Sequence, residues 1–299
     1  EAKGISQRRI DITASSEALT EIFRGIDVVF HVAAKVDMWG SYDDFYRTNV
    51  LGTRNIILAC RQAGVRRLVY TSSPSVVADG SDLLGVDETY PYAKEYKAYY
   101  PATKALAEQE VLAANDDSLF TCALRPHLIW GPGDTNLIPT VLVKARSGRL
   151  MQIGQGNNLV DFSYIKDCVH AHLCAARALD ENPASRGQAY FISQGEPTLL
   201  WEWIGEILDR NGIAPITRTV PSRIATVIAG FAEFFARCSP IEIEPFLTKF
   251  LVSEMSTSHY FCIEKAKRLL GYVPQYTMAE AMEETFAGQV LCEARSAVR

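Results

Sequence analysis

A tyrosine and a lysine four residues apart, Tyr100 and Lys104, give the sequence its strongest chemical signal. They lie at the start of a segment, residues 102–114, that reads as a helix. In a helix, side chains four apart share one face, about 5–6 Å apart at Cβ, so the hydroxyl and the ammonium face the same small volume. A cation beside a phenol favours phenolate, which makes Tyr100 a candidate general acid or base. Because this spacing is common in helices, the prediction needs support from elsewhere in the chain.

That support comes from residues 67–75, an apolar run that ends in hydroxyl side chains. The pattern is typical of a buried parallel strand, and ligands in open α/β sheets bind outside the carboxyl ends of the strands. Ser73 and Tyr100 could then both donate to one substrate oxygen, as carbonyl reduction or alcohol oxidation requires. Ser72 and Ser75 lie close enough to compete with Ser73 for this role.

Apolar strands alternate with helices along the first two thirds of the chain. The strands are expected at residues 9–13, 27–32, 67–72, 119–125, 151–153 and 188–193, and the helices at 16–23, 41–63, 102–114, 139–147 and 167–180. This alternation predicts an α/β fold with a doubly wound parallel sheet. A further helix follows residue 197, with Thr198 as its candidate cap, and residues 224–235 form the most apolar stretch.

Several motifs together resemble those of a known family. They are His31-Val-Ala-Ala34, Asn49, Thr71-Ser-Ser73, Tyr100-x-x-x-Lys104, Arg125-Pro-His-Leu-Ile-Trp-Gly-Pro-Gly133, Asn158-Leu-Val-Asp-Phe162 and Ser258-His-Tyr260. With them the chain resembles an extended short-chain dehydrogenase/reductase of the 3β-hydroxysteroid dehydrogenase family over nearly its whole length. Within that family it looks most like the branch that holds sterol-4α-carboxylate 3-dehydrogenases and bacterial 2-alkyl-3-oxoalkanoate reductases.

The resemblance implies roles for individual residues. Ser73, Tyr100 and Lys104 would be catalytic, with Asn49 positioning the lysine, and Lys104 would also bind the ribose of NAD or NADP. The implied cofactor-binding residues are Asp11, Ile12, Ala33, Ala34, Lys35, Tyr100, Lys104, Pro126 and His127. The implied substrate contacts are Trp39, Ser75, Trp130 and Phe162.

The family pattern also predicts how the chain is divided. Residues 1–130, with 161–195 returning to them, would form the dinucleotide-binding domain (Rossmann-like), and residues 131–160 and 196–299 a smaller, mostly helical substrate domain. The family's sheet begins with a strand and a Gly-x-x-Gly-x-x-Gly loop, and this first βαβ stretch is missing from the sequence. Either the sequence is a piece of a longer protein or the protein has lost its cofactor site. The motifs that remain favour the first explanation.

Composition limits the possible partners. A net charge of −5 gives no electrostatic footprint for nucleic acid. The seven cysteines are an odd, scattered set without a Cys-x-x-Cys pair, so we expect neither a disulfide framework nor a zinc site. His31, His170 and His172 are interpreted as structural, and no metal is expected. These features and the absence of an apolar run of 18 residues favour a cytoplasmic protein.

The resemblance implies an enzyme that moves a hydride between a nicotinamide and a 3β-hydroxy or 3-keto group on a large apolar substrate. That substrate would be a sterol, including a 4-carboxysterol with decarboxylation, or a long-chain 3-oxo acid. A nucleotide-sugar epimerase or dehydratase and a cofactor-less binding protein remain as alternatives. The apolar segment 224–235 is expected to be a substrate-domain helix over the mouth of the site, able to contact a membrane surface. A homodimer is also compatible with the sequence.

Overall fold

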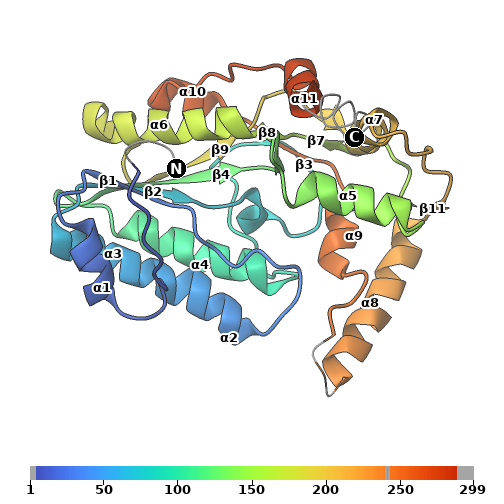
Figure 1. Ribbon diagram of the computed structural model, residues 1–299, viewed down its shortest axis with the longest axis horizontal. Coiled ribbons are helices and arrows are strands. Elements are labelled where there is room, and N and C mark those ends of the chain that lie inside the picture. The colour runs from blue at the N-terminus through green and yellow to red at the C-terminus, as the bar shows by residue number, and fades with distance from the viewer. Residues whose placement is uncertain (1–4, 240, 242, 288–299) are drawn as a thin grey trace, which may run out of the picture.

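The computed structural model describes residues 5–239, 241 and 243–287. Its centre is a parallel sheet in the order β1-β2-β4-β9 (Figure 1). These strands are β1 (Val28–His31), β2 (Arg67–Thr71), β4 (Phe120–Pro126) and β9 (Gln188–Ile192). Every residue of β4 is buried, as expected for a parallel strand covered on both faces. The predicted α/β fold with a parallel sheet is confirmed.

Helices cover both faces of this sheet (Figure 1). On one face lie α1 (Ser16–Phe23), α3 (Gly52–Ala63) and α4 (Tyr99–Ala113), and on the other α6 (Ile165–Glu181) and α10 (Glu264–Leu270). Each layer has its own apolar core: Leu19, Ile56 and Ala107 pack with Leu68 on the first side, and Ala171, Ala175 and Ala266 pack with Tyr190 on the second. The doubly wound arrangement therefore follows the predicted alternation of elements.

The strand predicted at residues 9–13 is wrong. The segment has no strand pairing and instead lies on α3, where Asn55 Nδ2 donates to Ile12 O at 2.9 Å. Asp11 Oδ1 accepts from Thr13 N at 2.8 Å, a local bond that favours a turn. A strand needs a neighbour, and among the described residues the only strand beside β1 is β2.

A second sheet joins distant parts of the chain. It has the order β10-β7-β12-β3, formed by β10 (Thr198–Leu199), β7 (Leu159–Val160), β12 (His259–Phe261) and β3 (Leu83–Val86). Two short pairs accompany it, β5 (Ile129–Trp130) with β8 (Ser163–Tyr164) and β6 (Gln152–Ile153) with β11 (Thr219–Val220). Most of these strands are too short to show the period-two pattern by which strands are recognised in a sequence.

The remaining helices surround a second apolar core near these short strands. They are α5 (Leu137–Arg146), α7 (Leu200–Arg210), α8 (Ser222–Cys238), α9 (Lys249–Ser256) and α11 (Met278–Ala287). Thr198, the predicted cap of the helix after residue 197, lies in β10, and Leu199 precedes α7. Figure 1 shows α8 extending away from the body, next to α9. No helix in the described part of the chain is long and apolar enough to cross a membrane.

The long helix predicted at residues 41–63 is present, with an interruption. It consists of α2 (Tyr42–Phe45), a π-helical turn η1 (Tyr46–Leu51) and α3. Gly64, at φ +77°, ends α3 in the left-handed region that glycine adopts most easily. Wide turns of this kind are often found at functional sites, and η1 contains the predicted site residue Asn49.

Candidate active site

A cavity of about 470 Å³ lies at the carboxyl ends of the parallel strands. Its lining includes residues that directly follow or end β1, β2 and β4, and its opposite wall comes from α5, α7 and α9. Of the predicted site residues, Ala34, Ser73, Ser75, Tyr100, Lys104, Pro126, His127 and Phe162 line this cavity together. The expected meeting of Ser73 and Tyr100 at one place is therefore present in the structure.

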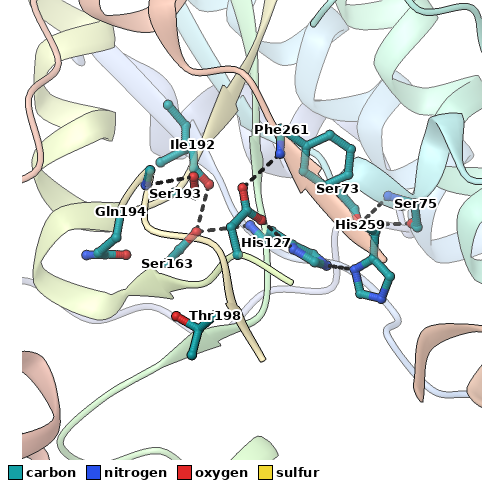
Figure 2. Close-up of polar contacts among 12 residues, drawn as sticks. Ser73, Ser75, His127, Ser163, Ile192, Ser193, Gln194, Thr198, His259 and Phe261 are labelled. Atoms are coloured by element: carbon teal, nitrogen blue, oxygen red, sulfur yellow. Dashed lines mark hydrogen bonds and ion pairs between the residues drawn. The ribbon is translucent and has the colours of Figure 1, made fainter. Parts of the chain in front are cut away.

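Ser73 begins a 3₁₀ turn, Pro74–Val77, and its hydroxyl is held locally. Its Oγ accepts from Ser75 N at 3.2 Å and lies 2.9 Å from Ser75 Oγ (Figure 2). Tyr100 lies in the first turn of α4, where Pro101 is tolerated because it costs no helical hydrogen bond. Burial raises the pKa of Tyr100 and the Glu254 carboxylate raises it further, whereas a hydrogen bond with Ser73 lowers it. Tyr100 is therefore a neutral phenol at neutral pH, ready to donate a proton.

Lys104 lies beneath this cavity, with only 2% of its surface exposed. Its Nζ donates to Thr71 O and lies 4.2 Å from the centre of the Tyr70 ring. Burial lowers the pKa of Lys104 to about 7, and the Glu108 carboxylate opposes this shift. The amine points at the end of β2, and Lys104 is not among the groups that shift the pKa of Tyr100.

The Asn49 side chain joins two separate segments next to the cavity lining. Its Oδ1 accepts from Lys35 N at 2.7 Å, and its Nδ2 donates to Lys35 O at 3.1 Å and to Thr103 Oγ1 at 3.0 Å. One buried amide thus joins the loop after β1 to the residue that precedes Lys104. The hydrogen bonds of the Asn49 amide go to Lys35 and Thr103, and the one to Thr103 connects it to α4.

The other predicted residues lie outside the cavity lining. Asp11 and Ile12 rest on α3, and Ala33 and Lys35 adjoin the lining. Trp39 lines a neighbouring hollow, with Arg237 5.6 Å from its ring.

Trp130 is 1% exposed and packs edge-on against Phe162 and Trp203. It therefore belongs to the second apolar core, whose aromatic cluster supports the cavity wall from behind.

Two residues of the cavity wall were missed by the sequence reasoning, Glu254 on α9 and His259 on β12. His259 lies in the Ser258-His-Tyr260 motif, but the family resemblance implies no role for it. No sequence pattern around Glu254 indicates a site residue. With His127 they place three potential ligand atoms within 4.8 Å of one another. Among the described residues this is the one group of three or more His, Cys, Asp and Glu side chains whose potential ligand atoms lie this close together.

The residues at the strand ends fit the nicotinamide riboside half of a dinucleotide. Lys104 is a buried donor whose acceptor among the described residues is Thr71 O, and Ser72 Oγ is buried without a hydrogen-bond partner at the cavity wall. Buried polar groups in native proteins are normally paired. Ribose hydroxyls and a carboxamide would supply the missing partners.

Comparisons with known proteins identify a family and related sequences. Residues 3–221 match the model of the 3-beta hydroxysteroid dehydrogenase/isomerase family. The 2-alkyl-3-oxoalkanoate reductase of Stenotrophomonas maltophilia is 44% identical over 93% of this chain and 85% of that protein. The decarboxylating sterol-4-alpha-carboxylate 3-dehydrogenase of Mus musculus is 38% identical over 91% of this chain and 76% of that protein. Both named relatives are oxidoreductases.

Among solved structures, MoeE5 in complex with UDP-glucose and NAD superposes with a TM-score of 0.69 at 24% identity. The match covers 96% of this chain and 86% of that one, and it supports the fold alone. Because the family model matches most of the chain and the relatives are similar over nearly all of it, the chain belongs to the 3-beta hydroxysteroid dehydrogenase/isomerase family.

Proposed function

We propose that the protein is an NAD- or NADP-dependent oxidoreductase acting on a secondary alcohol or ketone of a large apolar molecule. The observation that carries this proposal is the convergence of Ser73, Tyr100 and Lys104 in one apolar cavity at the carboxyl ends of the parallel strands. Open α/β sheets bind dinucleotides at this edge. The names of the relatives support the same class of reaction.

In the reducing direction, Tyr100 donates its proton to the substrate oxygen while the Ser73 hydroxyl donates a hydrogen bond to that oxygen. The raised pKa of Tyr100 suits this role, because a neutral phenol is the form that can give a proton. A bound reduced nicotinamide supplies the hydride. Lys104 would bind the ribose of the cofactor. Asn49 positions Lys104 through its hydrogen bond to Thr103, the preceding residue. Oxidation uses the same groups in reverse.

The cavity wall supports a lipid-like substrate. Met38, Leu128, Leu200, Trp203, Phe250 and Met255 line it, and burying apolar surface against them contributes about 25 cal/mol per Å². The relatives are named for a 3-oxo acid and for a sterol carboxylate, in both of which a carboxylate lies close to the reacting carbon. We therefore propose a long-chain 3-oxo or 3-hydroxy acid, or a 4-carboxysterol, as the substrate.

A nucleotide sugar fits this cavity less well. Lys104 and Lys144 are the only lysine or arginine side chains among the described lining residues, and Lys104 is buried beneath the floor. A sugar diphosphate needs several cationic or amide donors, whereas this wall carries the Glu254 carboxylate.

Turnover with a panel of substrates tests the proposed function. The oxidation or reduction of nicotinamide is followed by absorbance with a 2-alkyl-3-oxoalkanoate, a 4-carboxysterol and UDP-glucose, each with NAD(H) and NADP(H). We expect turnover with one of the first two. Turnover of UDP-glucose alone would favour an epimerase-type activity. Tight dinucleotide or lipid binding without turnover on any of them would identify a binding protein.

We also infer that α8 rests on a lipid surface. Its outer face carries Ile224, Val227, Ile228, Phe231, Phe234 and Phe235, each at least 40% exposed, and the exposed Ile241, Ile243 and Phe246 follow it. Its inner face packs on α9, with Glu233 accepting from Lys249 N at 2.7 Å. Exposed Arg223 and Arg237 flank the apolar face, an arrangement typical of helices that lie in the interface of an anionic membrane.

The segment 224–235, which was expected to lie over the mouth of the site, does not line the cavity. None of the described cavity-lining residues comes from α8, whereas α9 contributes Phe250, Leu251 and Glu254. Since α8 packs on α9, a lipid surface under α8 would lie next to the wall of the cavity. A second copy of this chain could cover the same face instead. Vesicle binding and the oligomeric state distinguish a lipid surface from a second copy.

A further inference from the structure

Four groups from separate segments form a continuous chain of hydrogen bonds in the cavity wall. His127 Nδ1 lies 2.7 Å from Asp161 Oδ1, and His127 Nε2 lies 3.2 Å from His259 Nδ1. The far nitrogen of the second ring, His259 Nε2, lies 2.8 Å from Glu254 O. Figure 2 shows the two rings joined at this contact, and they meet edge-on. Both imidazoles and Asp161 are buried.

The protons in this chain can be counted from the acceptor at its end. A backbone carbonyl only accepts, so His259 Nε2 carries a hydrogen. The contact between the rings needs a second hydrogen, on His127 Nε2 or His259 Nδ1, because two lone pairs do not bond. The contact between Asp161 and His127 needs a third for the same reason. A carboxylate and two neutral imidazoles carry only two such hydrogens, one on each ring. The three contacts therefore require one additional proton.

We propose that Asp161, His127 and His259 share this additional proton, and that it fastens the wall of the active site as a positioning network. His127 belongs to the strand end beside the proposed nicotinamide site, and His259 belongs to β12 in the second sheet. The proton therefore joins the two sides of the cavity. When it leaves, one of the three hydrogen bonds has to break, and the 3.2 Å contact between the rings is the longest.

Several acidic groups surround the shared proton. The Asp161 carboxylate is held in place by Phe261 N, which donates to Asp161 Oδ2 at 3.0 Å. Glu254 faces His259 from α9, and Tyr100 faces Glu254 across the cavity. Asp82, before β3, accepts from Ser258 N beside the ring. Burial lowers the pKa of His259, and the facing His127 lowers it further, whereas the Glu254 and Asp161 carboxylates and the hydrogen bond with Glu254 O act in the opposite direction.

The effect on catalysis rests on the proposed function. Loss of the proton at alkaline pH should loosen the wall and raise the KM for substrate by about fivefold, the factor for one hydrogen bond, with a smaller change in kcat. Tyr100 and Ser73 are not part of the network.

Two conservative variants remove the need for the proton without removing the hydrogen bonds. In Asp161→Asn, the amide can accept from Phe261 N and donate to His127 Nδ1, so both rings are satisfied when neutral. In His259→Asn, the side-chain amide replaces Nδ1 and can donate to His127 Nε2, which leaves His127 neutral beside Asp161. The proposal therefore predicts that the alkaline rise in KM disappears in both variants. In His259→Ala, KM should be raised at every pH.

The test measures KM and kcat between about pH 5 and pH 9, a range that spans the titration of imidazole. Histidine ¹⁵N NMR of the same proteins without substrate provides a readout independent of activity. The expected result is a protonated ring pair in the wild type and two neutral rings in Asp161→Asn. If at pH 6 both wild-type rings are neutral and carboxyl ¹³C NMR shows that Asp161 is ionised, or if Asp161→Asn keeps the alkaline rise in KM, the proposal is overturned.

A metal ion between the same nitrogens would also overturn it, since His127, His259 and Glu254 could act as ligands. In that case EDTA would raise KM and Zn²⁺ would restore it, and the NMR signals of both rings would shift with Zn²⁺. We expect neither reagent to change the KM at pH 6. Failure of every substrate to turn over would contradict the proposed function while leaving the NMR result to decide on the shared proton.

Discussion

Glu108 lies one helical turn after Lys104 on α4, and its buried carboxylate raises the pKa of that lysine against the larger effect of burial. Arg125 binds the same carboxylate, with Nη2 2.6 Å from Oε1, and the Tyr92 hydroxyl donates to it at 2.6 Å. The amine proposed to hold the cofactor is therefore electrostatically linked to an ion pair under the sheet.

The substitution Lys104→Met should change how stability depends on pH. The pKa of Lys104 is about 7 in the folded protein, below its ordinary value near 10.4. Between these values the unfolded chain binds the extra proton, so the free energy of unfolding rises with pH. From pH 7 to pH 9 this contributes about 2 kcal/mol, and the gain should vanish in the variant. Urea unfolding at both pH values measures it, with exposed Lys94→Met as the control, and an unchanged gain would contradict the burial argument.

Breaking the buried ion pair should be costly, and removing both partners less so. Arg125 and Glu108 are 3% and 0% exposed, so Arg125→Met leaves a buried carboxylate unpaired and should destabilise the protein by about 3–5 kcal/mol. The double variant with Arg125→Met and Glu108→Gln should regain much of the lost stability, because no unpaired charge remains buried. Chemical unfolding of both single variants and the double variant gives the coupling energy. Additive losses would show that the pair contributes no specific interaction.

Tyr100→Phe should lower turnover by about two orders of magnitude or more, the range for loss of a general acid, and should change dinucleotide affinity little. The neighbouring Tyr99, 41% exposed, provides a matched control, since Tyr99→Phe removes the same atom one residue away. Because the pKa of Tyr100 is raised, loss of its proton should not lower the kcat of the wild-type reduction until the pH exceeds about 10. Near-normal turnover in Tyr100→Phe would exclude its proposed role.

The central layer of the fold could be predicted because its signals are local. β2 and β4 are apolar runs and α4 carries Tyr100 and Lys104 at helical spacing, so neither needs distant partners to be recognised. The wall formed by His127 and His259 could not be predicted, because 132 residues separate the two rings and β12 reaches the cavity only through the second sheet. The strand predicted at residues 9–13 failed for a related reason, since strand propensity without a neighbouring strand does not produce pairing.

Charged substitutions on α8 should abolish vesicle binding. Phe231 and Phe235 are 61% and 68% exposed, so Phe231→Asp with Phe235→Asp should leave the fold intact and reduce binding to anionic vesicles by about tenfold or more. Leu173→Asp, at a 55% exposed position on α6, is the control. Flotation measures binding, and sedimentation velocity measures assembly. If the wild-type protein is a dimer that does not bind vesicles, and the double variant is a monomer, then the apolar face of α8 contacts a second copy of the chain.

The π-helical turn η1 makes the site depend on chain length at one place. A π turn holds an additional residue compared with an α turn, and each residue of a regular helix rotates the chain by about 100°. Deleting one residue of Tyr46–Leu51 other than Asn49 would let the helix close into a regular register and turn Asn49 away from Lys35 or Thr103. A deletion series through η1, assayed for dinucleotide affinity, would test this. Substitutions at the exposed Leu51 should be tolerated, whereas insertions and deletions here should not, so the length of this helix is constrained more strongly than its surface composition.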